Sequence, residues 1–224
     1  MAGASPGTGE GPGSTSRAGI VLVAAGESTR MGEPKQLLDW KGVPLLVYQL
    51  REAVSTGAAE IVVVLGHRRE EFLALVEPCL EPEGCREIAN PDYRQGKTSS
   101  IRRGVEALGE GLERLMILAL DQPRPAEVLQ RLLAAPLGGN SVLAIPTHQG
   151  RRGHPPVFHA SLRGELLAIA EEREGLREVI RRHRERTLAV EFASPDVLTN
   201  LNTPEDYRRA RGDACPPAAG GLSL

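Results

Sequence analysis

A polar loop punctuated by glycine follows an apolar run near the start of the chain. The run covers residues 20–25 and ends at Gly26, and the loop then carries Ser28, Arg30 and Lys35. A buried strand that ends in such a loop is how α/β proteins build a phosphate cradle, because glycines let backbone N–H groups approach an anion closely. The two cations supply the counter-charge. We therefore interpret this loop as a nucleotide-binding site.

The loop differs from the two standard phosphate-binding motifs. No G-x-G-x-x-G sequence opens a helix here, and Lys35 is not in a G-K-[ST] context. Pro34 disfavours helical geometry at Glu33, so no long helix is expected to start directly at Gly26. If the loop binds phosphate, it is a phosphate loop of another kind.

An acidic residue, Asp121, follows directly after a second apolar run, residues 115–120. This order of residues places the carboxylate at the carboxyl end of a buried strand, where it needs a cation or hydrogen-bond donors. One interpretation is a ligand for Mg²⁺ on a bound triphosphate. The other is a helix cap before Pro125, or an Asx turn with Gln122. The position alone leaves both open.

Two further polar segments are candidates for the site. Ser99 and Ser100 end a turn-rich stretch and are placed to cap a helix over residues 101–108, which is their default interpretation. His154 lies beside a proline and is either a turn residue or a contact to phosphate or substrate. Neither the histidines nor the cysteines show the spacing of a metal site.

Composition excludes several classes of protein. The 224 residues are 41% hydrophobic and 25% charged, which suits one large α/β domain. A net charge of −2 and 3% aromatic residues argue against a nucleic-acid-binding surface over the whole molecule. Three cysteines without a framework fit a reducing cytosol. We expect a cytoplasmic protein with no membrane span and no secretory signal.

Hydrophobic patterning predicts strands that alternate with helices. We expect strands at residues 20–25, 61–65, 86–89, 115–120, 142–145 and 187–192, the last near an edge. We expect helices at residues 44–57, 68–80, 101–108, 125–135, 161–170 and 175–184, and one that begins at Pro204 with Thr203 as its cap. This order predicts an α/β fold with a doubly wound, mostly parallel sheet and helices on both faces. Ligands bind such sheets beyond the carboxyl ends of the strands, near a topological switch point.

The predicted domain covers residues 19–211. Residues 1–18 and 212–224 are rich in Gly, Pro, Ser and Ala, and we expect both to be disordered tails.

Five ordered motifs resemble one enzyme family. VLVAAGESTRMGEPKQLLDWKGVPLL is similar to the signature of the MobA-like nucleotidyltransferases, and within them most similar to the molybdenum cofactor cytidylyltransferases. NPDYRQGKTSSIRRGVEAL, ALDQP, GRRGHPPVF and NLNTPEDY match in the same order. Together the motifs span residues 19 to about 211. The resemblance implies a Rossmann-like nucleotidyltransferase fold.

The resemblance also implies roles for individual residues. Catalysis falls to Arg30, Lys35 and Asp121, and Asp121 binds Mg²⁺. The pterin substrate lies beside Arg152, Gly153 and His154. The nucleotide-binding residues implied are Ala24, Ala25, Gly26, Ser28, Arg30, Lys35, Ser99 and Ser100.

Two features bear on which nucleotide is used. Guanylyl-transferring relatives tend to have a glycine at the position of Ala25, whereas cytidylyl-transferring relatives tend to have AAG, as here, which favours CTP. Cytidylyl-transferring relatives often carry aspartates where this chain has Asn200 and Asn202, one of them a candidate second metal ligand. An amide oxygen can bind Mg²⁺ but contributes no negative charge.

The resemblance therefore implies Mg²⁺-dependent transfer of CMP from CTP to the phosphate of molybdopterin, with release of pyrophosphate. A receiving molybdoenzyme is a further implied partner. The alternatives are guanylyl transfer from GTP, cytidylyl transfer to a sugar or polyol phosphate, a reductase, and a nucleotide-binding chaperone that delivers cofactor without turnover.

Overall fold

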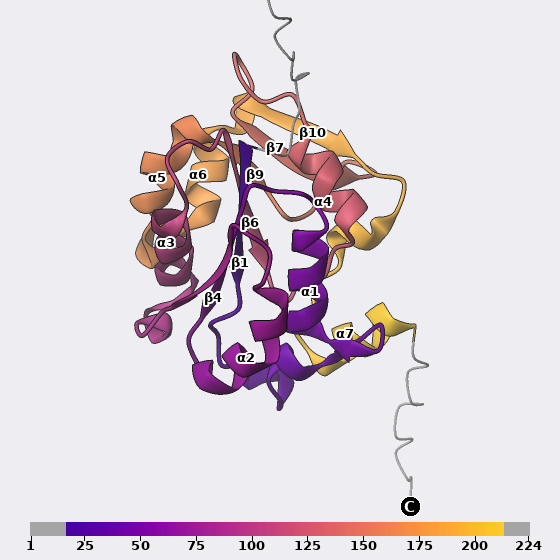
Figure 1. Cartoon of the computed structure of the whole chain (residues 1–224). Coiled ribbons are helices and arrows are strands. Elements are labelled where there is room, and N and C mark those ends of the chain that lie inside the picture. Colours follow the sequence, from indigo (N-terminus) through magenta and orange to yellow (C-terminus); the bar gives the residue numbers. More distant parts are fainter. Residues whose placement is uncertain (1–16, 213–224) are drawn as a thin grey trace, which may run out of the picture.

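The structure is a computed structural model in which residues 17–212 are described (Figure 1). The predicted tails lie outside these residues, apart from Arg17, Ala18 and Gly212. Ala18 is fully buried and begins the first strand, one residue before the predicted domain boundary. No helix among the described residues is long and apolar enough to cross a membrane.

Strands alternate with helices along the chain, as predicted. The strands are β1 (Ala18–Val23), β2 (Asp39–Trp40), β3 (Val43–Pro44), β4 (Glu60–Leu65), β5 (Cys85–Ala89), β6 (Arg114–Ala119), β7 (Leu143–His148), β8 (Arg151–Arg152), β9 (Val157–His159) and β10 (Thr187–Glu191). The helices are α1 (Leu45–Val54), α2 (Arg69–Val76), α3 (Lys97–Ala107), α4 (Ala126–Leu133), α5 (Arg163–Leu167), α6 (Leu176–Arg182) and α7 (Pro204–Arg211).

The main sheet has the order β10-β7-β9-β6-β1-β4-β5, and β8 pairs with β7. The chain builds β1, β4 and β5 outward in one direction and then returns through α3 to place β6 on the other side of β1. The switch point therefore lies between the carboxyl ends of β1 and β6. This is the sheet edge where a doubly wound fold binds its ligand.

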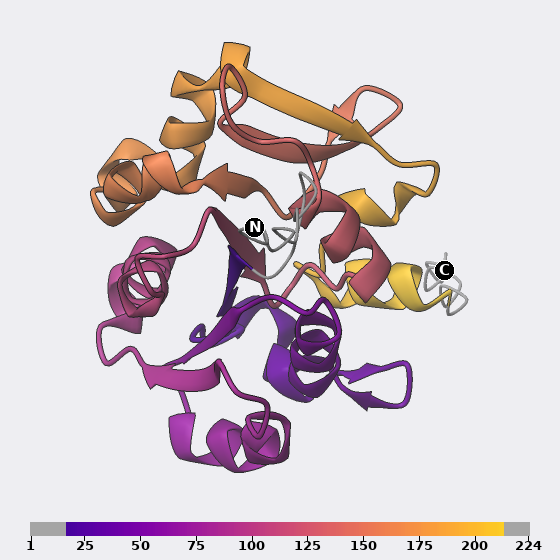
Figure 2. The same ribbon diagram turned by 45° about the horizontal axis from the view of Figure 1, so that its top comes forward.

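Alternating side chains of the sheet feed two separate hydrophobic clusters. Ile20 and Leu22 of β1 pack with α1, α2 and α4, while Val21 and Val23 pack with α3, α5 and α6. The two helix groups lie on opposite faces of the sheet (Figures 1 and 2). The α/β architecture with helices on both faces is confirmed.

The sheet is less uniformly parallel than a simple alternation implies. β9 is antiparallel to both of its neighbours, β6 and β7, and β8 is antiparallel to β7. The sequence analysis left residues 146–158 without a strand, because β9 has only three residues and follows two prolines. The hairpin of β2 and β3 was also not predicted, and α7 contacts it through Tyr207 and Asp39, with 2.6 Å between the Tyr207 hydroxyl and the Asp39 carbonyl oxygen.

Candidate active site

The loop after β1 folds back on itself through Ser28. This residue has a left-handed backbone (φ 58°), and its hydroxyl accepts a hydrogen bond of 3.0 Å from the backbone N–H of Lys35. Gly32 provides a second positive φ, of 75°, and Met31 is buried in the core. These contacts bring Lys35 back to the carboxyl end of β1, although it lies nine residues after Gly26.

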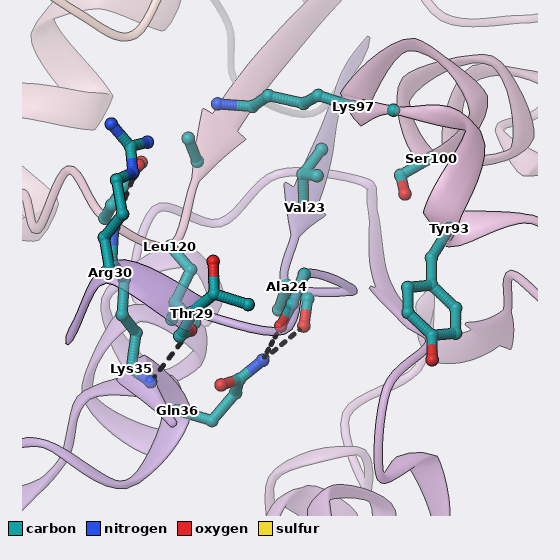
Figure 3. A pocket seen from close by; sticks show the side chains of 15 residues that line it. Val23, Ala24, Thr29, Arg30, Lys35, Gln36, Tyr93, Lys97, Ser100 and Leu120 are labelled. Carbon is teal, nitrogen blue, oxygen red and sulfur yellow. Dashed lines mark hydrogen bonds and ion pairs between the residues drawn. The ribbon is translucent and has the colours of Figure 1, made fainter. Parts of the chain in front are cut away.

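Gln36 supports this loop from beneath, and the sequence analysis did not identify it. Its side chain is 1% exposed and donates to the carbonyl oxygens of Ala24, at 2.8 Å, and Gly26, at 3.1 Å. Both bonds close over ten or more residues, so no local pattern signals them. The two hydrogen bonds from Gln36 fix the backbone of the loop where it lines the site (Figure 3).

Replacing Gln36 with leucine is expected to lower the free energy of unfolding by about 1–3 kcal/mol, because the buried carbonyl oxygen of Ala24 and the part-buried one of Gly26 lose their donor. Nucleotide affinity should fall with it, since the loop loses its fixed conformation. The matched control is Gln95→Leu, whose side-chain amide makes one exposed contact to Asp92. Chemical denaturation and nucleotide titration check both effects. Equal stability in the two variants would contradict the assigned role.

Lys35 and Asp121 meet across the switch point. Lys35 Nζ lies 3.5 Å from Asp121 Oδ2, and their side chains are 12% and 24% exposed. Loss of hydration lowers the pKa of Lys35 below its usual value, and the Asp121 carboxylate offsets part of that effect. The structure thus brings together two residues that are 86 positions apart in the sequence and that were both predicted to be catalytic.

Three cations surround a cavity of about 260 Å³ at this edge. Arg30 and Lys35 come from the first loop, and Lys97 reaches across from the start of α3 on the opposite side (Figure 3). Arg30 and Lys97 form no ion pair within the described part of the chain, and Asp121 is the only acidic residue among those that line the cavity. The excess of positive charge suits a polyanion such as a triphosphate. Lys97 was not among the predicted site residues.

Three buried side-chain oxygen atoms among the described residues have no hydrogen-bond partner: Oε1 of Gln36, Oδ1 of Asp121 and Oδ1 of Asn200. Gln36 and Asp121 line the cavity, and Asn200 lies on a second segment next to Asp121. A backbone hydrogen bond of 2.7 Å from the Leu201 N–H to the Asp121 carbonyl oxygen holds the two segments together. Buried polar atoms without partners call for an explanation such as an ion. The pair of Asp121 and Asn200 fits Mg²⁺, which takes one or two side-chain oxygens and completes its shell with water and substrate phosphates.

The competing interpretation of Asp121 as a helix cap is not supported, because α4 begins after Pro125 and no side chain caps it.

Among residues 17–212, no group of three or more His, Cys, Asp or Glu side chains could hold a metal. Asn202 is half-buried, next to the Thr203 cap of α7, and no described contact joins it to Asp121. Of the two asparagines, only Asn200 has a buried side-chain oxygen without a partner among the described residues, and it precedes the Leu201 N–H that bonds to Asp121.

The two predicted serines lie inside α3 and do not cap it, which corrects their default interpretation. Helix α3 begins four residues earlier than expected, and its N-terminal N–H at Thr98 is bonded by Glu171 instead. Asn90 donates to both serine hydroxyls, at 2.9 Å for Ser99 and 2.8 Å for Ser100. Ser100 lines the cavity, whereas Ser99 lies outside its lining. Of the two serines, Ser100 therefore contributes to the lining of the cation-lined cavity.

Ala24 and Gly26 line the cavity, but Ala25 is not part of its lining. Ala25 is 1% exposed and faces the core on the α3 side of the sheet. A Cβ placed on Gly66 would lie 2.9 Å from the Cβ of Ala25 and 2.8 Å from the Cβ of Tyr93. Tyr93 lines the cavity, so Ala25 lies near the site without being part of its lining.

The segment before β9 brings His154 to the opposite side of the site. Its backbone N–H donates to the Val197 carbonyl oxygen at 3.1 Å, and Gly153 is packed so closely that a Cβ would lie 2.2 Å from the same oxygen. Arg152 is exposed on β8. Glycine is required at position 153 because the backbone passes too close to Val197 for a side chain. The neighbouring residues Arg152 and His154 are exposed.

The His154 residue is exposed, and positively charged groups act on its ring. Reduced hydration lowers its pKa to about 4, and the charges of Lys97 and Arg124 act in the same direction, against an opposing effect of Asp121. The ring is neutral at physiological pH and can accept as well as donate a hydrogen bond. Its sensitivity to Lys97 and Asp121 places it on the same side of the sheet edge as the cation-lined cavity.

This fold and site define an α/β enzyme that binds a nucleoside triphosphate at the switch point of its sheet. Residues 20–187 match the MobA-like NTP transferase domain, and the chain belongs to this family of nucleotidyltransferases. The family predicted from the motifs is thereby confirmed.

Individual relatives differ in the nucleotide that their names state. The chain is 26% identical to the molybdenum cofactor cytidylyltransferase of Escherichia coli, over 85% of this chain and 94% of that protein. It is 28% identical to a probable molybdenum cofactor guanylyltransferase of Bacillus cereus, over 88% and 96%. The bifunctional protein GlmU of Sorangium cellulosum is 29% identical over 70% of this chain, which spans only 35% of GlmU.

Two solved structures support the fold. A nucleotidyl transferase from Methanothermobacter has a TM-score of 0.73 and 26% identity, over 88% of this chain and 96% of that one. Rv0371c of Mycobacterium tuberculosis, crystallised with manganese, has a TM-score of 0.67 and 23% identity, over 88% and 100%.

Proposed function

We propose that the protein transfers CMP from CTP to the phosphate of molybdopterin or its molybdenum-bound form. The observation that carries this proposal is the junction of three cations with two unpartnered oxygens, those of Asp121 and Asn200, at one sheet edge. The cytidylyltransferase of E. coli and the order of the motifs support the acceptor. We further propose that the reaction takes place in the cytoplasm and that a molybdoenzyme receives the product.

In the proposed reaction an oxygen of the acceptor phosphate attacks the α-phosphorus of CTP. The new O–P bond forms as the bond between the α-phosphorus and the bridging oxygen breaks, and pyrophosphate leaves with the electron pair. Arg30 and Lys35 stabilise the charge on the leaving group, and Lys97 attracts the incoming phosphate. Catalysis then consists of positioning and charge stabilisation, with no covalent enzyme intermediate.

Asp121 and Asn200 would hold a divalent metal, which we propose is Mg²⁺. When bound, it would supply charge neutralisation on the triphosphate. The manganese complex of Rv0371c supports the choice of a divalent ion. Asn200 adds no negative charge, so Asp121 provides the only carboxylate of this pair.

The preference for CTP rests on the volume behind Tyr93. Gly66 lies close to both the Ala25 methyl group and the Cβ of Tyr93, so we propose that Ala25 limits how far the Tyr93 side of the cavity can widen. A pyrimidine needs less width than a purine.

Replacing Ala25 with glycine is therefore expected to shift the ratio of kcat/KM values for CTP and GTP toward GTP by about tenfold, the effect of one methyl group in a packed site. Ala24→Gly is the matched control, since it adds the same backbone freedom on the other face of the strand. Steady-state rates with each nucleotide measure the ratio. A larger shift in the Ala24 variant would contradict this explanation of nucleotide choice.

The function itself is tested by incubating the protein with Mg²⁺, molybdopterin and either CTP or GTP, and measuring pyrophosphate and the nucleotidylated pterin. Release with CTP at a higher kcat/KM than with GTP is the expected result. Faster turnover with GTP would identify a guanylyltransferase. CTP binding without pyrophosphate release would identify a delivery chaperone. Release only with a sugar or polyol phosphate would replace the acceptor, and tight NAD(P)H binding would point to a reductase.

A further inference from the structure

A fully buried arginine lies three residues after Asp121. Arg124 has 0% exposure, and its backbone N–H donates to Gln49 Oε1 at 3.0 Å. Its guanidinium donates to four backbone carbonyl oxygens: those of Pro123 at 2.7 Å, Val197 at 2.8 Å, His154 at 2.9 Å and Thr199 at 3.0 Å.

These carbonyls belong to three segments that are distant in sequence. They follow β6, precede β9 and precede α7, and each segment contributes one residue to the candidate site. The Arg124 guanidinium donates to the Thr199 carbonyl oxygen, and the backbone carbonyl oxygen of Asp121 accepts from the Leu201 N–H. The backbone is therefore fixed on both sides of Asn200.

The same guanidinium fixes the acceptor side. It binds the carbonyl oxygen of His154, and it also binds the Val197 carbonyl that accepts the His154 N–H. The backbone of His154 is thereby held at both its donor and its acceptor. One side chain thus positions the residues proposed for the metal and those proposed for the acceptor.

The charge of Arg124 is buried without a direct carboxylate partner. No carboxylate within residues 17–212 forms an ion pair with it, and its hydrogen bonds go to neutral carbonyls. Burial lowers its pKa to about 10, and the charges of Asp196 and Asp121 oppose that shift. Burying a charge costs free energy that hydrogen bonds only partly offset. An apolar side chain would remove the buried charge but would leave these four carbonyl oxygens without their side-chain donor, so the arginine fixes the three segments relative to one another.

We propose that Arg124 is a positioning residue that couples the metal corner at Asp121 and Asn200 to the acceptor side at His154. This inference rests on the proposed function for the identity of the ligands, but the coupling itself is a property of the free protein. Only arginine offers a planar set of five donors that can reach four carbonyls at once. Lysine keeps the charge but has three donors on one atom.

The test compares Arg124→Lys and Arg124→Gln with Arg163→Lys as a matched control. Arg163 also donates to backbone carbonyls, those of Val105, Leu108 and Gly109, at the end of α3 away from the cavity. Helix α3 has 11 residues and spans about 16 Å. Arg124→Gln removes the buried charge and retains two donors, so it serves if the lysine variant does not fold. Circular dichroism melts establish which variants are folded.

Two readouts that need no turnover follow. Mn²⁺ affinity is measured by water proton relaxation in the presence of CTP, and again with GTP. We expect a ten- to hundredfold loss in both Arg124 variants, as for other residues that orient metal ligands, and less than twofold in Arg163→Lys. The titration of His154 is followed by the NMR signal of its Cε1 proton, assigned with His154→Gln.

The NMR titration of His154 distinguishes a change in the position of its segment from a change in the surrounding charge. Lys97, Arg124, Arg177 and Asp121 are the charged groups that influence this ring, and Arg124→Lys leaves all four charges in place. A rise in the His154 pKa of that variant therefore reports loosening of the segment, and it can be measured even if no nucleotide binds. Unchanged Mn²⁺ affinity and an unchanged His154 pKa in a folded Arg124 variant would overturn the proposal. Failure of the pyrophosphate assay in the wild type alone would reject only the proposed function.

Discussion

Replacing Asp121 with asparagine is expected to lower nucleotidyl transfer by about 10²-fold or more, the scale of losing one preorganised electrostatic group. Asp121 provides the only carboxylate at the corner it shares with Asn200, and its Oδ1 atom is buried without a partner. The asparagine has nearly the same shape, so the fold is retained while the negative charge is lost. Steady-state release of pyrophosphate at saturating CTP measures the effect.

The variant should also need more metal. If Asp121 holds the ion, the half-saturating concentration of Mg²⁺ rises in the asparagine variant, and excess metal restores part of the rate. The control is Asp39→Asn, which removes the same charge from the exposed hairpin strand β2 and its pairing with Arg211. Near-normal turnover and an unchanged Mg²⁺ requirement in Asp121→Asn would reject this residue as the metal ligand.

Lys35→Ala is expected to have an effect of similar size, about 10²-fold, because it removes the least exposed of the three cations from the leaving-group side. The appropriate control is Lys41→Ala. Lys41 lies in the turn of the β2–β3 hairpin and contacts Tyr48 of α1. A 10²-fold loss in both variants would indicate a general effect of charge, and no loss in Lys35→Ala would exclude the assigned role.

The lowered pKa of Lys35 predicts the direction in which activity changes with pH. Burial lowers the pKa of its ammonium group, and the active form is the protonated one. Activity is therefore complete below this pKa and is lost as the pH rises through it, at a lower pH than for an ordinary lysine. Arginine stays protonated throughout this range, so Lys35→Arg should flatten the alkaline limb of the kcat/KM profile, which reports on the free enzyme.

The sequence predicted the parallel core of the sheet well because its strands are buried on both faces. The continuous apolar runs of β1, β4 and β6 leave no alternative once their length is considered. Their carboxyl ends then had to meet, which is why the first loop and Asp121 could be assigned to one site from the sequence alone.

Two of the residues that were missed, Gln36 and Arg124, act over long distances through neutral groups. Gln36 and Arg124 bind backbone carbonyls from remote segments, and a carbonyl oxygen leaves no trace in the amino-acid sequence. The serines of α3 were misplaced for a related reason. Their partner Asn90 and the Glu171 carboxylate that bonds the helix N-terminus lie outside the local window.

The reversed strand β9 divides the enzyme into two parts with different freedom to change. The proposed triphosphate side is built from parallel strands joined by helices. Changing a connection there alters a whole strand–helix–strand unit. His154 instead lies on the return path of an antiparallel excursion, between the β7–β8 turn and β9. Antiparallel neighbours can be joined by a short loop of variable length. With the acceptor side proposed at His154, the sheet would allow acceptor specificity to diversify by loop exchange, while the proposed nucleotide site stays fixed in the parallel core.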